Sequence, residues 1–223
     1  MVDASPSSSL SVQAGECCPW RRINWPNVIS IGRLLLAVAV LAVLGWYHDA
    51  GALSASLLWW AAGLTLLVIV LDGVDGYVAR TFNQATPQGA VIDILGDRSV
   101  EYIYWVAFAA WQWVPLWVPL VVLLRGVWVD GLRALAFKEG FTAFGQTTLL
   151  QSKLAIILVS SRASRWLYAA LKAVVFVVIL GNQALQLSGN TVLAGWAEGL
   201  TVATVVFCVL RGLPVLAEAK RFM

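Results

Sequence analysis

Four aspartates, Asp72, Asp75, Asp93 and Asp97, lie within a short stretch of a chain that is strongly apolar on both sides of them. Burying a carboxylate in an apolar environment is unfavourable, and neighbouring carboxylates also repel one another. They can remain ionised together where cations bind between them. Ligand sets made of oxygen alone suit Mg²⁺, Mn²⁺ or Ca²⁺ and not zinc. The four residues therefore predict a pair of divalent metal ions, an arrangement that supports phosphoryl transfer.

Helical periodicity of about 100° per residue gathers these aspartates on two faces. The first helix carries a face of acidic and small residues with an arginine at its edge: Asp72, Asp75, Gly76, Ala79 and Arg80. The next helix carries a matching face of glycines and aspartates: Gly89, Asp93, Gly96 and Asp97. The turn between the two helices makes them antiparallel, so we expect the faces to meet. The small residues leave room there, and the arginine provides a fixed positive group for a phosphate.

The composition predicts an all-α, polytopic membrane protein. The chain of 223 residues is 60% hydrophobic and 12% charged, whereas a soluble domain has about 25% charged residues. Its apolar stretches approach the roughly 20 residues that cross a bilayer as a helix. We expect six transmembrane helices, at about Val28–Trp46, Leu53–Arg80, Gly89–Trp111, Val114–Phe137, Trp166–Leu180 and Val192–Leu210. The apolar run Leu154–Val159 is too short to span.

Basic residues predict the orientation of these helices. Three of the expected loops, around residues 48–51, 112–115 and 181–190, contain no Lys or Arg. The positive-inside rule places them outside, and it places both termini and the ends of helices 2 and 3 that carry the aspartates in the cytoplasm. Tryptophans flank the uncharged loops as an aromatic belt: Trp46, Trp59, Trp60, Trp111, Trp113, Trp117 and Trp196. The net charge of +3 then suits anionic lipids and phosphate-bearing substrates and requires no nucleic acid.

The chain divides into a tail and one membrane domain. Residues 1–20 are polar and Ser-rich and lack the pattern of a signal peptide, so we expect a disordered cytoplasmic tail. Residues 21–223 form the expected six-helix domain. Cys17 and Cys18 are adjacent and Cys208 is remote, which shows neither a disulfide framework nor a zinc spacing.

Acidic residues in a membrane segment also occur along ion pathways. Here the acids gather near one face of the membrane, and on the other side Asp49 and Glu198 are isolated. A pathway needs ionisable relays at depth, so the pattern favours an enzyme, with a cation or proton transporter as the alternative.

The aspartate segment resembles the CDP-alcohol phosphotransferase, or phosphatidyltransferase, family. The family pattern reads D-x2-D-G-x2-A-R-x8-G-x3-D-x3-D, and each fixed position is met here, by Asp72, Asp75, Gly76, Ala79, Arg80, Gly89, Asp93 and Asp97. The segment Asn24–Ala37, with Arg33, resembles the first helix of the family. The six-helix layout also fits, so the resemblance covers most of the chain.

This resemblance implies transfer of a phosphatidyl group from CDP-diacylglycerol to a small polar alcohol, with release of CMP. It implies two Mg²⁺ or Mn²⁺ ions as cofactors, and a homodimer in the membrane. Carried over by position, the metal ligands are Asp72, Asp75, Asp93 and Asp97, and Asp97 is also the general base. The CDP moiety is implied to bind at Asp72, Gly76, Ala79, Arg80 and Gly89.

The acceptor is predicted from arginines. Arg125 and Arg133 lie eight residues apart in the fourth expected helix, and arginines within an apolar helix suggest an anionic partner. Asp130 is spaced to pair with Arg133, which leaves Arg125, or Arg133 in another rotamer, for a substrate phosphate. With Arg33, these residues are the predicted acceptor phosphate site. Of the other basic residues, Lys138, Lys153 and Arg162 are expected to set topology.

Residues Arg125–Gly140 resemble the phosphatidylglycerophosphate synthase branch, in which the acceptor is glycerol 3-phosphate. The Gly-Lys-x-Lys-Thr-like segment that follows in that branch is not matched here. Inositol phosphate, or a free alcohol such as serine, is therefore the alternative acceptor.

Overall fold

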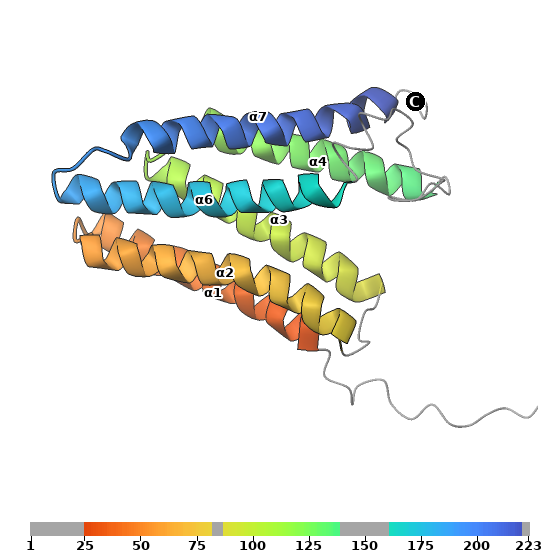
Figure 1. Ribbon diagram of the computed structural model, residues 1–223, viewed down its shortest axis with the longest axis horizontal. Helices are drawn as coiled ribbons and strands as arrows, with labels where there is room; N and C mark the ends of the chain where they lie inside the picture. The colour runs from red at the N-terminus through yellow and green to blue at the C-terminus, as the bar shows by residue number, and fades with distance from the viewer. Residues whose placement is uncertain (1–24, 82–86, 139–160, 220–223) are drawn as a thin grey trace, which may run out of the picture.

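The computed structural model describes residues 25–81, 87–138 and 161–219, and this part of the chain is entirely helical apart from its connections. Its elements are α1 Trp25–Asp49, α2 Ala55–Thr81, α3 Pro87–Ala110, α4 Trp117–Lys138, α6 Arg162–Leu187 and α7 Ala194–Ala219. The helices form one elongated bundle (Figure 1). The pair α1 and α2 lies on one side, α4 and α7 lie on the other, and α3 and α6 run between them. The predicted all-α fold is thus confirmed, with one helix for each expected span.

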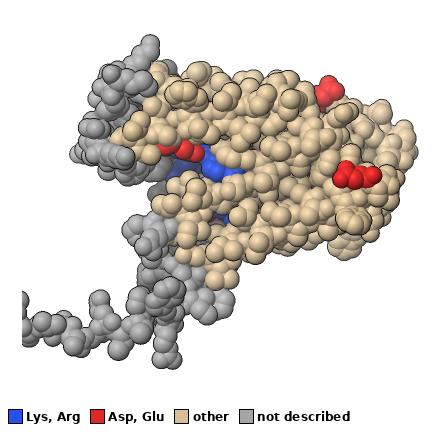
Figure 2. All heavy atoms as spheres, turned by 180° about the vertical axis from the view of Figure 1, so that it is seen from behind, with Lys and Arg blue, Asp and Glu red and all other residues tan. Residues whose placement is uncertain are grey.

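Four of the six helices are long and apolar enough to cross a membrane: residues 27–49, 55–74, 163–187 and 194–217. The helices α3 and α4 do not join this group, since the charged side chains discussed below interrupt their apolar sequence. The bundle surface is rich in exposed Leu, Val and Trp side chains. Figure 2 shows this surface as a broad uncharged middle with charged groups towards the two ends.

Local signals explain where these helices begin and end. The hydroxyl of Ser161 caps α6 by accepting from the Ser164 N–H at 3.1 Å. The helix starts at Arg162, before the predicted Trp166, and continues to Leu187. The fourth helix starts at Trp117 and not at the predicted Val114, because residues 111–116 form the turn that ends α3. The predicted tail, residues 1–20, and the run 154–159 lie outside the described residues.

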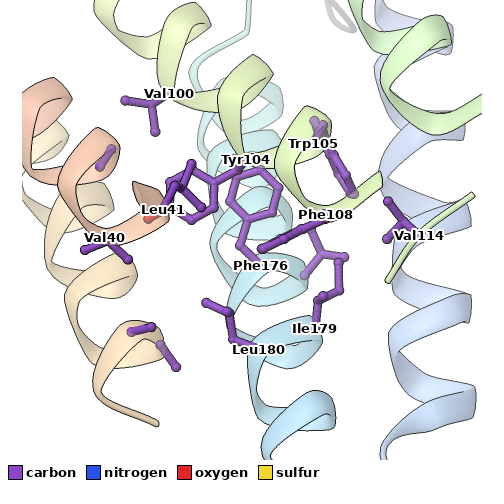
Figure 3. Close-up of a cluster of buried hydrophobic side chains, with 14 of the residues drawn as sticks. Val40, Leu41, Val100, Tyr104, Trp105, Phe108, Val114, Phe176, Ile179 and Leu180 are labelled. Carbon is purple, nitrogen blue, oxygen red and sulfur yellow. The ribbon is translucent and has the colours of Figure 1, made fainter. Parts of the chain in front are cut away.

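The core beside the predicted site is aromatic. In Figure 3, Phe176 of α6 lies among three side chains of α3, Tyr104, Trp105 and Phe108. Its ring centroid is 5.0 Å from those of Tyr104 and Trp105 and 5.7 Å from that of Phe108. The Tyr104 hydroxyl lies 2.9 Å from the Thr65 hydroxyl of α2. These contacts fix α3 against α6 and α2, and therefore also fix the charged residues one to two turns away along α3.

The helices α3 and α4 approach closely at Gly126. A methyl group there would overlap the Tyr102 hydroxyl and lie 2.8 Å from the ring carbon that bears it. We expect Gly126→Ala to lower the free energy of unfolding by about 1–3 kcal/mol, because a tightly packed contact would have to open. Gly131→Ala on the same helix is the control, since nothing lies within 4 Å of that position. Thermal unfolding of the purified protein measures both, and adding Tyr102→Phe should restore part of the loss.

Candidate active site

An arginine of α1 joins two of the predicted aspartates. Arg33 is 2% exposed, and its guanidinium forms ion pairs with Asp72 of α2 and, at 3.0 Å, with Asp93 of α3. It also donates to the Asp93 carbonyl oxygen at 3.3 Å. A Cβ at Gly96 would lie 3.4 Å from this guanidinium, at van der Waals distance, so the guanidinium packs directly against the backbone of α3. Three helices are thus held together through one buried cation.

A lysine of α6 makes the corresponding link on the other side of α3. The ammonium of Lys172 lies 2.9 Å from Oδ1 of Asp97 and 3.4 Å from Oε2 of Glu101. Glu101 is 1% exposed, and its second oxygen accepts a hydrogen bond from the Tyr168 hydroxyl. Each charged group in this network therefore has a partner of opposite charge, as buried ions require.

The two sets of ion pairs border one small pocket. Its walls include Arg33, Asp72, Asp97, Glu101 and Lys172, and its volume is about 30 Å³, which is room for about one water-sized species. Figure 2 shows acidic and basic groups meeting in a hollow of the surface. The structure thus places Asp72 and Asp97 at one pocket and links Asp93 to it through Arg33. Lys172 and a further carboxylate, Glu101, also line this pocket.

The rest of the motif lies on the same two helices. Asp75, Gly76, Ala79 and Arg80 belong to the last turns of α2, which ends at Thr81. Gly89 lies in the first turn of α3. The side chains of Asp75, Ala79 and Arg80 lie outside the described part of the structure, so their predicted roles remain predictions.

The donor set fits a hard divalent cation, since the motif supplies carboxylate oxygens and no nitrogen or sulfur. Among the described side chains, no three acidic, His or Cys residues form a group that could hold a metal ion. Asp75 is the remaining member of the four predicted metal ligands, and its side chain is not among those described. Arg33 and Lys172 balance part of the carboxylate charge, and divalent ions would balance the remainder.

A second charged region lies where α4 meets α3. Asp130 of α4 pairs with Arg98 at 3.3 Å and with Arg133 at 3.9 Å, and Arg98 also reaches Glu101 at 3.5 Å. The predicted pairing of Asp130 with Arg133 is present. Through Arg98 and Glu101, this region is connected to the aspartate pocket.

Arg125 and Arg211 are the buried cations of this region that lack full hydrogen bonding. Each is 9% exposed. Nε and Nη1 of Arg125 and Nε of Arg211 have no hydrogen-bond partner among the described residues. Gly212 leaves the space that Arg125 occupies, because a Cβ there would lie 2.9 Å from the Arg125 side chain. Unsatisfied buried guanidinium groups are costly unless an anion meets them.

Sequence reasoning missed several members of these networks. Glu101 continues the four-residue spacing of Asp93 and Asp97, and this periodicity could have identified it. Lys172 and Arg211 are basic residues in apolar helices. No local pattern relates Lys172 to α3, or Arg211 to Tyr168 of α6, whose ring it overlies. Arg33, predicted beside the acceptor phosphate, contacts the aspartates in the structure.

The amino-acid sequence matches a known protein family and several named relatives. The profile of the CDP-alcohol phosphatidyltransferase family matches residues 23–206, which is most of the chain. The chain belongs to this family. Together with its four apolar helices, this makes it an integral membrane protein.

Individual relatives carry related names. A CDP-diacylglycerol–glycerol-3-phosphate 3-phosphatidyltransferase of Cereibacter sphaeroides is 33% identical over 116 residues, or 50% of each chain. The match thus spans about half the length of that relative. A probable phosphatidylglycerophosphate synthase of Mycobacterium tuberculosis is 25% identical over 221 residues, 97% of this chain and 92% of that one. A second protein of that species, provisionally named a cardiolipin synthase, is 30% identical over 127 residues, 57% of each chain.

The buried network makes a prediction about stability. Lys172→Met removes the cation beside Glu101 and Asp97, and breaking a buried ion pair typically costs about 3–5 kcal/mol. We expect the apparent melting temperature of the purified protein to fall by roughly 10 °C. The double variant Lys172→Met/Glu101→Gln should recover a large part of this loss, because the buried carboxylate is also removed. An unchanged melting temperature in Lys172→Met would contradict the assigned network.

Proposed function

We propose that this protein transfers the phosphatidyl group of CDP-diacylglycerol to glycerol 3-phosphate, giving phosphatidylglycerophosphate and CMP. The observation that carries the proposal is that Asp72 and Asp97, from a complete family motif, line one pocket with Arg33 and Lys172. Asp93 of the same motif pairs with Arg33. The printed names of the Cereibacter sphaeroides relative and of the longer Mycobacterium tuberculosis match support the same reaction.

In this proposal the donor binds at the meeting point of α2 and α3. Asp72, Asp75, Asp93 and Asp97 would hold two Mg²⁺ or Mn²⁺ ions, and bound ions would supply positive charge to the pyrophosphate and to the leaving CMP. The small residues Gly76, Ala79 and Gly89 leave space for the cytidine. Arg80 provides a guanidinium for a phosphate oxygen. The lipid chains remain in the bilayer beside the bundle.

Asp97 acts as the general base. Its carboxylate takes the proton of the acceptor hydroxyl, whose oxygen bonds to the phosphorus of the phosphatidyl group. The bond from that phosphorus to the CMP phosphate oxygen breaks in the same displacement. Lys172 holds Oδ1 of Asp97 at 2.9 Å, which fixes the orientation of the carboxylate towards the reacting hydroxyl.

The acceptor phosphate is assigned to the arginines of α4. Arg125 has two unpartnered nitrogens, and a phosphate satisfies such a guanidinium better than a neutral alcohol does. This favours glycerol 3-phosphate or inositol phosphate over serine. Arg133, which pairs weakly with Asp130 at 3.9 Å, is positioned to assist. Arg33 forms ion pairs with Asp72 and Asp93. We therefore assign the acceptor phosphate to the arginines of α4 ahead of Arg33.

Membrane topology is part of the proposal. The helices α3 and α4 contain 24 and 22 residues, about 36 and 33 Å at 1.5 Å per residue, which is enough for a hydrocarbon core of about 30 Å. We therefore assign six crossings to residues 21–223, with residues 1–20 as a tail. The distribution of Lys and Arg supports cytoplasmic termini and a cytoplasmic active site. A homodimer is inferred from family resemblance.

The reaction is tested by CMP release from CDP-diacylglycerol by the purified protein. We expect release with Mg²⁺ or Mn²⁺ and glycerol 3-phosphate, and none in excess EDTA, since unshielded carboxylates repel the donor pyrophosphate. Inositol 1-phosphate, serine and inositol test the alternative acceptors. Phosphatidylglycerol tests the reaction suggested by the relative provisionally named a cardiolipin synthase. Full turnover in EDTA, or an absence of turnover with every acceptor, would contradict the proposal.

The acceptor site is tested by Arg125→Ala. Loss of a charge-assisted contact of about 1.5–3 kcal/mol should raise KM for glycerol 3-phosphate roughly tenfold or more, while CDP-diacylglycerol affinity stays nearly unchanged. Arg125→Lys should rescue poorly, because lysine lacks the planar fork. Titration of the acceptor at saturating donor measures this. If Arg125→Ala and Arg133→Ala both keep the wild-type KM, the arginines are structural.

A further inference from the structure

A second, much larger pocket lies at the opposite end of the bundle from the aspartates. Its walls come from the C-terminal end of α3, the turn before α4, the C-terminal half of α6 and the N-terminal half of α7. Its volume is about 840 Å³, within the range of roughly 300–1,000 Å³ typical of small-molecule sites. The proposed transfer reaction makes no use of this pocket.

One wall is held rigid by the turn that ends α3. The Trp113 N–H bonds the Phe108 carbonyl at 2.8 Å and the Gln112 N–H bonds that of Ala109 at 3.0 Å, which is a Schellman cap. Gln112 has φ 62°, in the left-handed region that usually takes glycine at this position. The residue that adopts this conformation, Gln112, lines the pocket. The Trp113 ring beside it is fixed against Trp111, with centroids 4.7 Å apart.

The opposite walls carry hydrogen-bond acceptors and negative charge. Asn182 of α6 lines the pocket and is 6% exposed, and its Oδ1 has no hydrogen-bond partner among the described residues. Glu198 of α7 adds a carboxylate. The described residues that line the pocket include no Lys or Arg. This charge pattern disfavours a ligand with a net negative charge and favours one with a cationic group that carries N–H donors.

The pocket also opens onto the apolar outer surface. Three of its wall residues, Leu116, Trp117 and Val202, are 66%, 45% and 48% exposed. A ligand with an apolar tail can therefore reach it from the bilayer. Tryptophan faces attract cations in addition.

We propose that this pocket binds the head group of a phospholipid that carries a primary ammonium. The ammonium supplies N–H donors to Asn182 and a positive charge to Glu198, and it lies near Trp113 and Trp117. The side-chain amide of Gln112 donates to the lipid phosphate. The acyl chains leave past Leu116 and Val202. The site is independent of the transfer reaction and lies at the other end of the same helices.

Lipid competition tests the proposal. The purified full chain, in a mild nonionic detergent, is given equal amounts of phosphatidylethanolamine, phosphatidylcholine and phosphatidylglycerol with identical acyl chains. Native mass spectrometry then identifies the bound lipid. Phosphatidylcholine keeps the charge but lacks N–H donors, and phosphatidylglycerol lacks the cation. We expect phosphatidylethanolamine to be retained about tenfold over phosphatidylcholine, the effect of one hydrogen bond to a charged group.

Matched variants locate the binding. Asn182→Leu and Glu198→Gln should each reduce phosphatidylethanolamine retention severalfold and leave phosphatidylglycerol retention unchanged. Asp49→Asn is the control, because it removes an acidic group that does not line the pocket. Glu198 is exposed, so its variant folds even if the buried Asn182 position tolerates no change. Equal retention of phosphatidylethanolamine and phosphatidylcholine, or wild-type retention in Glu198→Gln, would overturn the proposal.

Discussion

Carboxylates that lie close together in an apolar bundle repel one another unless cations separate them. In this protein the cations come first from the chain itself. Arg33 of α1 lies between Asp72 of α2 and Asp93 of α3, and Lys172 of α6 lies between Asp97 and Glu101. Each of these ion pairs joins different helices. The need to pair these carboxylates with cations therefore also determines which helices pack against α3 and their position along its axis.

The aromatic core makes that arrangement rigid. Phe176 lies one turn beyond Lys172 on α6 and packs against Tyr104, Trp105 and Phe108 (Figure 3). Because the same two helices carry the ion pairs and the ring contacts, a shift of α6 along α3 would disturb both at once. The charged groups also explain why α3 and α4, unlike the other four helices, contain no uninterrupted apolar stretch long enough to cross a membrane. The charged groups of the aspartate site come from α1, α2, α3 and α6, and the exposed Leu, Val and Trp side chains of the bundle provide the surface that suits lipid.

The sequence alone is enough to predict the six helices and to recognise the aspartate motif. Apolar length predicts each helix, and a period of 3.6 residues predicts that Asp72, Asp93 and Asp97 converge. The sequence alone does not predict which residues of distant helices form ion pairs with these aspartates. The contact between Lys172 and Asp97 joins positions 75 residues apart, and no local spacing encodes it. Arg33 illustrates the same limit, since its sequence context suggested a substrate phosphate whereas the fold places it against two aspartates.

The central claim, that the aspartates bind a pair of divalent ions together with the donor, is tested most directly by electron paramagnetic resonance of Mn²⁺ titrated into the purified full chain with CDP-diacylglycerol. We predict two Mn²⁺ ions bound per chain, with the broadened signal of neighbouring ions. Asp93→Asn should weaken this binding, because a ligand charge is lost. Wild-type protein that binds no more Mn²⁺ than a variant with both Asp72→Asn and Asp93→Asn would contradict the account.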